Sequence, residues 1–168
     1  LKAFALGLNR RRGDFVRGRP GKRTRIVNDE FFSEVNVLNS YWAGFIAADG
    51  SISKNGHSVE IGLAACDREH LEKFVRDTGF DGRVRDKAGD YPAVRVSVTS
   101  WRWVDDLRVN FSITPNKSLT LKPPPQLGSD EEIAFAAGYI DGDGSVGPRT
   151  QIVGSEYMME WFRELFDR

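Results

Sequence analysis

Two aspartates, Asp49 and Asp143, stand at the same place in two copies of a nonapeptide. The copies, residues 42–50 and 136–144, share alanine, glycine, isoleucine, aspartate and glycine, with an aromatic residue at one further position. Each aspartate is expected at the C-terminal end of a helix, where the helix dipole disfavours a negative charge. A bound cation would remove this conflict, and paired carboxylates suit hard divalent cations such as Mg²⁺, which also bind phosphate. In the alternative interpretation, the two residues are ordinary acids at helix ends.

Small residues in the same nonapeptides predict that the two helices pack closely. Gly44 and Ala48 lie four residues apart in the first copy, as do Gly138 and Gly142 in the second, so each pair lies on one helix face. Glycine inside a helix costs roughly 1 kcal/mol relative to alanine. Close approach of two backbones is the compensation that we expect.

The elements around the first copy follow from hydrophobic spacing and turn residues. A helix near residues 40–50, with Asn39 or Ser40 as its cap, is followed by a hairpin whose Asn55-Gly56 turn suits type I′. A helix capped by Asp67 comes next, then two strands and a helix capped by Ser100. The predicted order is αββαββα.

The second copy is expected in a helix that begins with a capping box at Ser129 and Glu132. A short strand pair over residues 145–153 and an apolar helix over residues 156–166 follow. Residues 127–168 are too few for a second complete set of elements, so we expect about two strands and a helix to be missing from the second repeat. Because the chain begins at Leu1 inside an apparent helix, residues preceding it are also expected.

Both nonapeptides resemble the motif of the LAGLIDADG homing endonucleases, and the resemblance extends over residues 38–168. It implies an α+β fold in which two pseudo-symmetric αββαββα repeats pack through the motif helices, with the second repeat incomplete. The implied organisation is an arm, a first repeat, a linker and a second repeat: residues 1–37, 38–113, 114–126 and 127–168.

The resemblance also implies an activity, which is the cutting of both strands of DNA at a long, nearly asymmetric site by a monomer. The implied cofactor is Mg²⁺ or Mn²⁺, with Ca²⁺ as a non-catalytic substitute. Asp49 and Asp143 would hold the metal, together with the preceding residues Ala48 and Gly142. The residues expected in the helix interface are Ala43, Gly44, Ala47, Ala137, Gly138 and Asp141.

A basic residue that assists catalysis is not found where relatives of this family often have a glutamine or lysine, at the end of the second strand. Residues 64–66 there are alanine, alanine and cysteine. Lys117, just after the first repeat, is the substitute candidate for the catalytic set. A solvated linker lysine is the alternative, and Cys66 is interpreted as structural.

Alternation in the two later strands of the first repeat predicts a sheet with one apolar face and one face for DNA. Arginine in a strand that lies in the major groove can pair with guanine. The residues predicted on the DNA face are Arg83, Arg85, Lys87, Arg95, Ser97 and Thr99. A merely solvated sheet face is the alternative interpretation.

The formal net charge is zero, but residues 1–26 carry nine lysines and arginines against Asp14 alone. Such a basic arm is suited to binding a polyanion such as DNA. Its beginning resembles the end of a helix-turn-helix. Arg17 and Arg19 lie in a segment that resembles the core of an AT-hook. A disordered solubilising tail is the alternative.

The rest of the composition limits the class of protein. One cysteine and two histidines exclude a disulfide framework or a zinc site, and the lack of a long apolar run or signal peptide favours the cytosol. A non-cleaving relative, such as a maturase or transcriptional regulator, is the alternative function, although retention of both acids favours cleavage.

Overall fold

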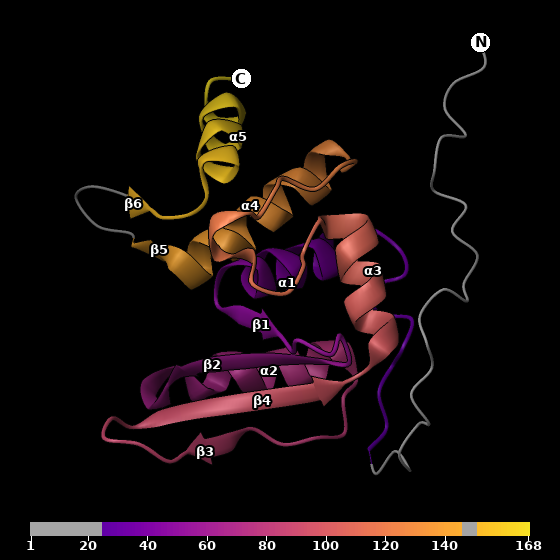
Figure 1. Cartoon of the computed structure of the whole chain (residues 1–168), viewed down its shortest axis with the longest axis vertical. Coiled ribbons are helices and arrows are strands. Elements are labelled where there is room, and N and C mark those ends of the chain that lie inside the picture. Colours follow the sequence, from indigo (N-terminus) through magenta and orange to yellow (C-terminus); the bar gives the residue numbers. More distant parts are fainter. Residues whose placement is uncertain (1–24, 146–150) are drawn as a thin grey trace.

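The computed structural model describes residues 25–145 and 151–168 of an α+β protein whose helices α1 and α4 lie side by side (Figure 1). Arg17 and Arg19, predicted to contact DNA, lie outside the described residues. No helix in the described part of the chain is both long and apolar enough to cross a membrane.

The first repeat has the predicted order αββαββα. Its elements are α1 (Val37–Ala48), β1 (Gly50–Ile52), β2 (Ser58–Ala64), α2 (Arg68–Thr78), β3 (Arg85–Lys87), β4 (Ala93–Thr99) and α3 (Trp101–Phe111). The four strands form an antiparallel sheet in the order β1-β2-β4-β3. Helices α2 and α3 pack against it.

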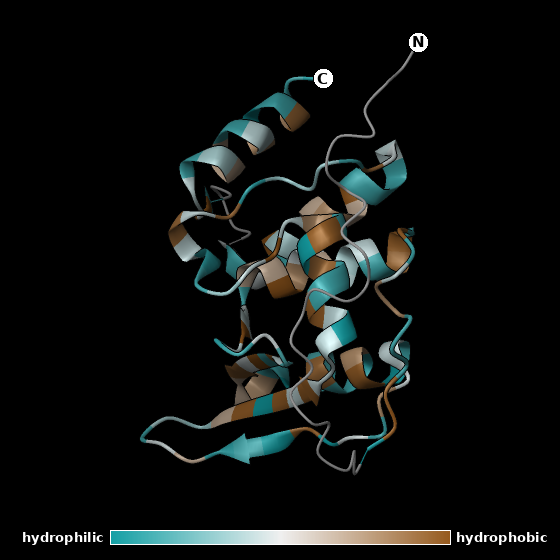
Figure 2. Ribbon diagram, turned by 45° about the vertical axis from the view of Figure 1, so that its right-hand side comes forward, coloured by the Kyte–Doolittle hydropathy of each residue, from teal (hydrophilic) through white to brown (hydrophobic). Residues whose placement is uncertain are grey.

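Strand β4 alternates as predicted. Its valines are buried and its intervening side chains are exposed, which gives the sheet one apolar and one polar face. Hydrophobic and hydrophilic residues alternate along the strand in Figure 2. Gly50 in β1 pairs with Ile61 in β2, and Ile61 pairs with Val96 in β4. This register ties the end of α1 directly to the centre of the sheet, because Asp49 precedes Gly50 in the chain.

The segment before α1 belongs to the globule rather than to the arm in which it was predicted. Phe32 is fully buried and its ring lies 5.1 Å from that of Trp103 in α3. The Trp103 indole donates a 2.7 Å hydrogen bond to the Asn28 carbonyl. The first structural unit therefore begins well before residue 38, because aromatic packing holds this irregular segment against α3.

Helix α1 begins earlier than the sequence predicted. Asn36 is its N-cap and forms a reciprocal capping box with Asn39, so neither Asn39 nor Ser40 is the cap. Both asparagine side chains accept hydrogen bonds, Asn36 from the backbone of Asn39 at 3.0 Å and Asn39 from the backbone of Asn36 at 2.8 Å.

Of the other predicted caps, only Ser100 bonds as expected, accepting from the Trp103 backbone at 3.2 Å. Asp67 precedes α2 without a side-chain cap bond. The box at Ser129 and Glu132 is wrong: Gly128 is the N-cap of α4 (Ser129–Asp143). Glu132 instead binds the Trp161 indole and Arg168, and these tertiary partners outcompete the local cap.

The β1–β2 turn is not the predicted type I′, which needs positive φ at two successive residues. Only Gly56 has positive φ, at 67°, and Asn55 does not. Gly56 donates a 2.8 Å hydrogen bond to the Ser53 carbonyl, which closes a turn one residue earlier than predicted.

The second repeat consists of α4, the strand pair β5 (Gly144–Ser145) and β6 (Gln151–Ile152), and α5 (Glu156–Phe166). The predicted strand pair and final helix are both observed. Met158 and Phe162 are the buried residues of α5. The Phe162 ring lies 5.4 Å from Tyr139, which anchors α5 to α4.

Ser40 provides a test of the packing of α1. Its side chain is fully buried, and Oγ has no hydrogen-bond partner among the described residues. Ser40→Ala should therefore stabilise the fold by about 1 kcal/mol and raise Tm by roughly 2–4 °C. Ser155→Ala is the matched control, because Ser155 is also buried but its Oγ bonds to Leu121 and Met158. Ser155→Ala should lower Tm. An equal fall in Tm for both variants would contradict the conclusion that the Ser40 hydroxyl has no hydrogen-bond partner.

Candidate active site at the ends of the paired helices

Helices α1 and α4 approach so closely that backbone meets backbone at two glycines. A Cβ on Gly44 would clash with the carbonyl of Phe135, and a Cβ on Gly138 would clash with the carbonyl of Tyr41. The two contacts are equivalent under the repeat, because Gly44 aligns with Gly138 and Tyr41 with Phe135. Both glycines thus lie where the sequence predicted them.

The other residues predicted for the interface are distributed differently. Ala137 is exposed, which contradicts its assignment to the interface. Ala43 and Ala47 are buried, but the close contacts of α1 with α4 run through its neighbouring face, including Ala48. Asp141 is exposed yet accepts a 2.6 Å hydrogen bond from the Tyr41 hydroxyl across the interface.

The crossing places the C-terminal ends of the two repeated helices in one region. Asp49 is the C-cap of α1 and Asp143 is the last residue of α4. A Cβ built on Gly142 would lie 3.6 Å from Asp49 Oδ2 and 2.5 Å from the Ala48 Cβ. The structure therefore brings together the four residues predicted to hold a metal.

The glycines after the two acids, Gly50 and Gly144, lie close to the backbone of the helices that precede them. Neither Gly50 nor Gly144 has positive φ, so neither provides a left-handed helix end. A Cβ on Gly50 would lie 2.7 Å from the Ile46 carbonyl oxygen, and one on Gly144 would clash with the Ile140 carbonyl. Glycine is required at both positions because the chain turns back against its own helix.

The two carboxylates disturb each other's ionisation. Burial raises the pKa of Asp49 to about 6, the negative charge of Asp143 adds to the rise, and Lys117 opposes it. Asp143 keeps an exposed side, but burial of the remainder raises its pKa, again opposed by Lys117. Such a pair favours a positive charge between or beside the two groups.

Lys117 provides that charge. It is only 7% exposed, and its Nζ donates a 3.0 Å hydrogen bond to the Ala48 carbonyl. Burial lowers the pKa of Lys117, whereas Asp143 and Asp49 raise it. A 3₁₀ turn, Lys117–Leu119, directs the side chain inward, and Asn116 precedes it with φ 59°. The interpretation of Lys117 as a solvated linker residue is therefore wrong.

The donor set fits a hard divalent cation. The carboxylates of Asp49 and Asp143 and the carbonyl of Gly142 are oxygen ligands of the kind that Mg²⁺ prefers. The carbonyl of Ala48, which was also predicted to hold the metal, accepts the Lys117 ammonium instead. No group of three or more histidine, cysteine or acidic side chains that could hold a metal occurs within the described residues. The remaining coordination positions would therefore fall to water and to substrate oxygens.

The predicted DNA face is the polar face of the sheet. Arg85, Lys87, Arg95, Ser97 and Thr99 are exposed on strands β3 and β4, and Arg83 is exposed just before β3. β3 is hydrophilic throughout (Figure 2). Sequence reasoning missed Glu60, although the alternation of β2 placed it on this face; Arg95 Nη1 lies 3.6 Å from Glu60 Oε2.

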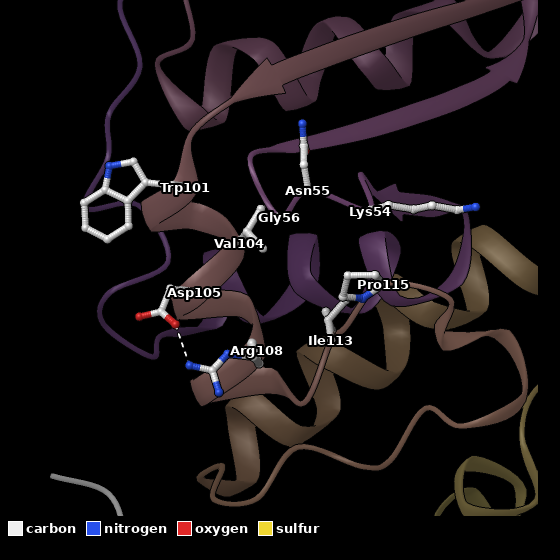
Figure 3. Close-up of a pocket in the computed structure, with 9 residues that line it drawn as sticks. All are labelled: Lys54, Asn55, Gly56, Trp101, Val104, Asp105, Arg108, Ile113 and Pro115. Carbon is white, nitrogen blue, oxygen red and sulfur yellow. Dashed lines mark hydrogen bonds and ion pairs between the residues drawn. The ribbon is translucent and has the colours of Figure 1, made fainter. Parts of the chain in front are cut away.

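A pocket of about 240 Å³ lies away from these acids, between the β1–β2 turn and α3 (Figure 3). Trp101 lines it and is half exposed, and Lys54 and Pro115 lie on the opposite side. Neither Asp49 nor Asp143 lines this pocket.

The ionisation of Asp49 predicts a pH-dependent stability. Its pKa is about 6 in the folded chain against 3.8 for a free side chain, so this group stabilises most below pH 4 and loses that contribution as pH rises through 6. Without metal, Asp49→Asn should be more stable than the parent at pH 8 by about 1 kcal/mol, after allowance for solvent screening. The gain should shrink toward pH 4.

Thermal unfolding at several pH values in a chelating buffer measures this difference. Adding Mg²⁺ at pH 8 should stabilise the parent chain more than the variant, because only the parent has both carboxylates. A difference that is the same at pH 4 and pH 8 would contradict the raised pKa.

A search against models of known protein families finds no match to this chain, and a search of curated proteins finds none either.

Proposed function

We propose that this chain is a site-specific endonuclease that hydrolyses both strands of double-stranded DNA with a divalent cation, on a LAGLIDADG homing-endonuclease fold. One observation carries the proposal: two helices from repeated segments cross at glycines and deliver Asp49 and Asp143 to one site. An acid pair of this kind, beside a buried lysine and a basic sheet face, suits a phosphodiester substrate.

In this proposal Asp49 and Asp143 would hold the cation, with the carbonyl of Gly142, whereas the Ala48 carbonyl accepts the hydrogen bond of Lys117. When bound, the cation supplies an activated water and stabilises charge on the phosphate and on the leaving oxygen. Both carboxylates must be ionised to hold it, which for Asp49 requires a pH above about 6. Each repeat contributes one acid, so each acid serves one DNA strand.

Lys117 contributes a fixed positive charge beside the acids. Its hydrogen bond to the Ala48 carbonyl holds Nζ in place without occupying all three of its protons. A free N–H can donate to a phosphate oxygen or orient a water molecule. Because the ammonium is buried, its charge acts more strongly than it would in water.

The sheet holds the duplex in this proposal. Its polar face carries Arg85, Lys87 and Arg95 on adjacent strands, and a two-stranded ribbon of this width fits the major groove. Asp49 lies at the beginning of β1, so a duplex on the sheet face passes the acids.

The test begins with selection of a target from duplexes that have a long randomised core, with Ca²⁺ in place of Mg²⁺. The full chain should enrich a defined sequence, and Mg²⁺ or Mn²⁺ should then support cutting of both strands, whereas Ca²⁺ should not. Enrichment without cutting in Mg²⁺ would favour a binding protein such as a regulator or maturase. Failure to bind any duplex would refute the proposal.

Replacement of Lys117 tests its part in the reaction. Lys117→Met should lower the single-turnover cutting rate by about 10²-fold with little effect on duplex binding. The pH at which the rate is half-maximal should move upward, because loss of the ammonium raises the pKa of Asp49 further. Lys122→Met is the matched control, since Lys122 lies over the Tyr157 ring and is not among the charges that shift the pKa of Asp49 or Asp143. An unchanged pH profile would contradict a role beside Asp49.

A further inference from the structure

Two arginines face each other across neighbouring strands of the sheet. Arg85 in β3 and Arg95 in β4 are paired in register, and both are exposed. Like charges directly opposite each other destabilise a strand pair. No carboxylate in residues 25–145 or 151–168 forms an ion pair with Arg85. The arrangement therefore favours an electron-rich partner over the sheet.

Arg95 also has an acceptor beside it. Its Nη1 lies 3.6 Å from Oε2 of Glu60 in β2, which is too far for a normal hydrogen bond. Charge attraction restricts the guanidinium, yet its donors and the acceptors of Glu60 stay available. Both side chains are about half exposed, at 47% and 39%.

The sheet surface beside Arg95 and Glu60 is open on the side of Gly62. Gly62 is the β2 residue paired with Arg95, and a Cβ at Gly62 would meet only the Val94 carbonyl, at 3.8 Å. The next pair on the same face of the sheet, two residues along each strand, is Ala64 with Ala93, which are also small. A flat base edge can therefore approach the guanidinium from this side without a steric barrier.

The carboxylate of Glu60 argues against a phosphate as the partner of Arg95. A phosphate bound at Arg95 would be repelled by Glu60, whereas the major-groove edge of a guanine·cytosine pair presents acceptors next to a donor. Guanine offers N7 and O6 to arginine, and the N4 amino group of cytosine donates to a carboxylate.

We propose that Arg95 and Glu60 together read one G·C base pair of the target, Arg95 donating to the guanine and Glu60 accepting from the cytosine amino group. This inference rests on the proposed function. Gly62 lies next to Ile61, the partner of Gly50, so Arg95 is about two strand spacings, or about 10 Å, from the start of β1. The G·C pair thus lies about three base pairs from the acids.

Target selection with full-length variants tests this inference. The parent chain should enrich guanine at one position near the cut, and Arg95→Gln should reduce that preference at least about tenfold and shift it toward adenine. Glu60→Ala should weaken the same preference without lowering affinity. Preferences at the other positions should be unchanged. Circular dichroism checks that each variant is folded, as expected for exposed side chains.

Arg163→Gln is the matched control, because Arg163 pairs with Glu160 in the same exposed manner on α5, at 3.4 Å. It should keep the parent preference. If Arg95→Gln weakened binding to all sequences equally, Arg95 would be a phosphate contact and the inference would be overturned. Retention of the guanine by Arg95→Gln would also overturn it, while leaving the endonuclease proposal intact. If the parent bound no duplex, both proposals would fail.

Discussion

Asp49→Asn and Asp143→Asn, separately, are expected to lower the rate of DNA cutting by at least about 10³-fold while duplex binding is retained. Each substitution removes one negative charge from the pair, and an asparagine oxygen is a much weaker ligand for Mg²⁺ than a carboxylate. Since each acid serves one strand in the proposed arrangement, the single variants should differ in the strand on which residual nicking appears. Single-turnover cutting of a duplex labelled on either strand measures both effects.

Comparing the loss of cutting with the change in thermal stability distinguishes a catalytic defect from misfolding. Without metal, Asp49→Asn should be at least as stable as the parent chain at pH 8, because the raised pKa of Asp49 marks ionisation as unfavourable there. Lost cutting would therefore accompany a gain in Tm.

Asp167→Asn is the matched control for these variants. Asp167 is the C-cap of α5 with φ −86° and ψ −3°, close to the −87° and −13° of Asp49. It reproduces the local setting of a helix-end aspartate without the paired carboxylate, so cutting should be unaffected. Persistent cutting by the Asp49→Asn, Asp143→Asn double variant would refute the catalytic assignment.

Gly138→Ala is expected to destabilise the folded chain by about 3 kcal/mol and to lower Tm by roughly 6–12 °C. The added Cβ would overlap the Tyr41 carbonyl, and this atom belongs to a helix backbone that cannot rotate away. Gly44→Ala should have a similar effect through the Phe135 carbonyl. Thermal and denaturant unfolding measure both.

The double variant should lose less than the sum of the two single changes, because the first substitution already separates the helices. Gly89→Ala is the control, since a Cβ at Gly89 would have no atom within 4 Å. It should leave Tm nearly unchanged. A Gly138→Ala variant as stable as Gly89→Ala would show that the helices are not in backbone contact.

The local patterns of the chain predicted most of the elements, because each depends on a short period. The repeated nonapeptide identified α1 and α4 and the alternation of β4 identified its buried face; neither needs information from distant residues. Caps and turns were less predictable. Several neighbouring polar residues could cap α1, and Asn36 is the one that does. Glu132 binds Trp161 rather than a helix end, because a tertiary contact replaces the local one.

The sequence by itself determined that two matching helices carry one acid each and that small residues let them approach. Only the tertiary structure decided which distant side chains and backbone groups meet, at the acids and on the sheet. Lys117 reaches the Ala48 carbonyl across 69 positions of the chain, and Glu60 approaches Arg95 through strand register. Such pairs are set by the path of the backbone in three dimensions, whereas helix and strand periodicity is set by neighbours a few residues apart.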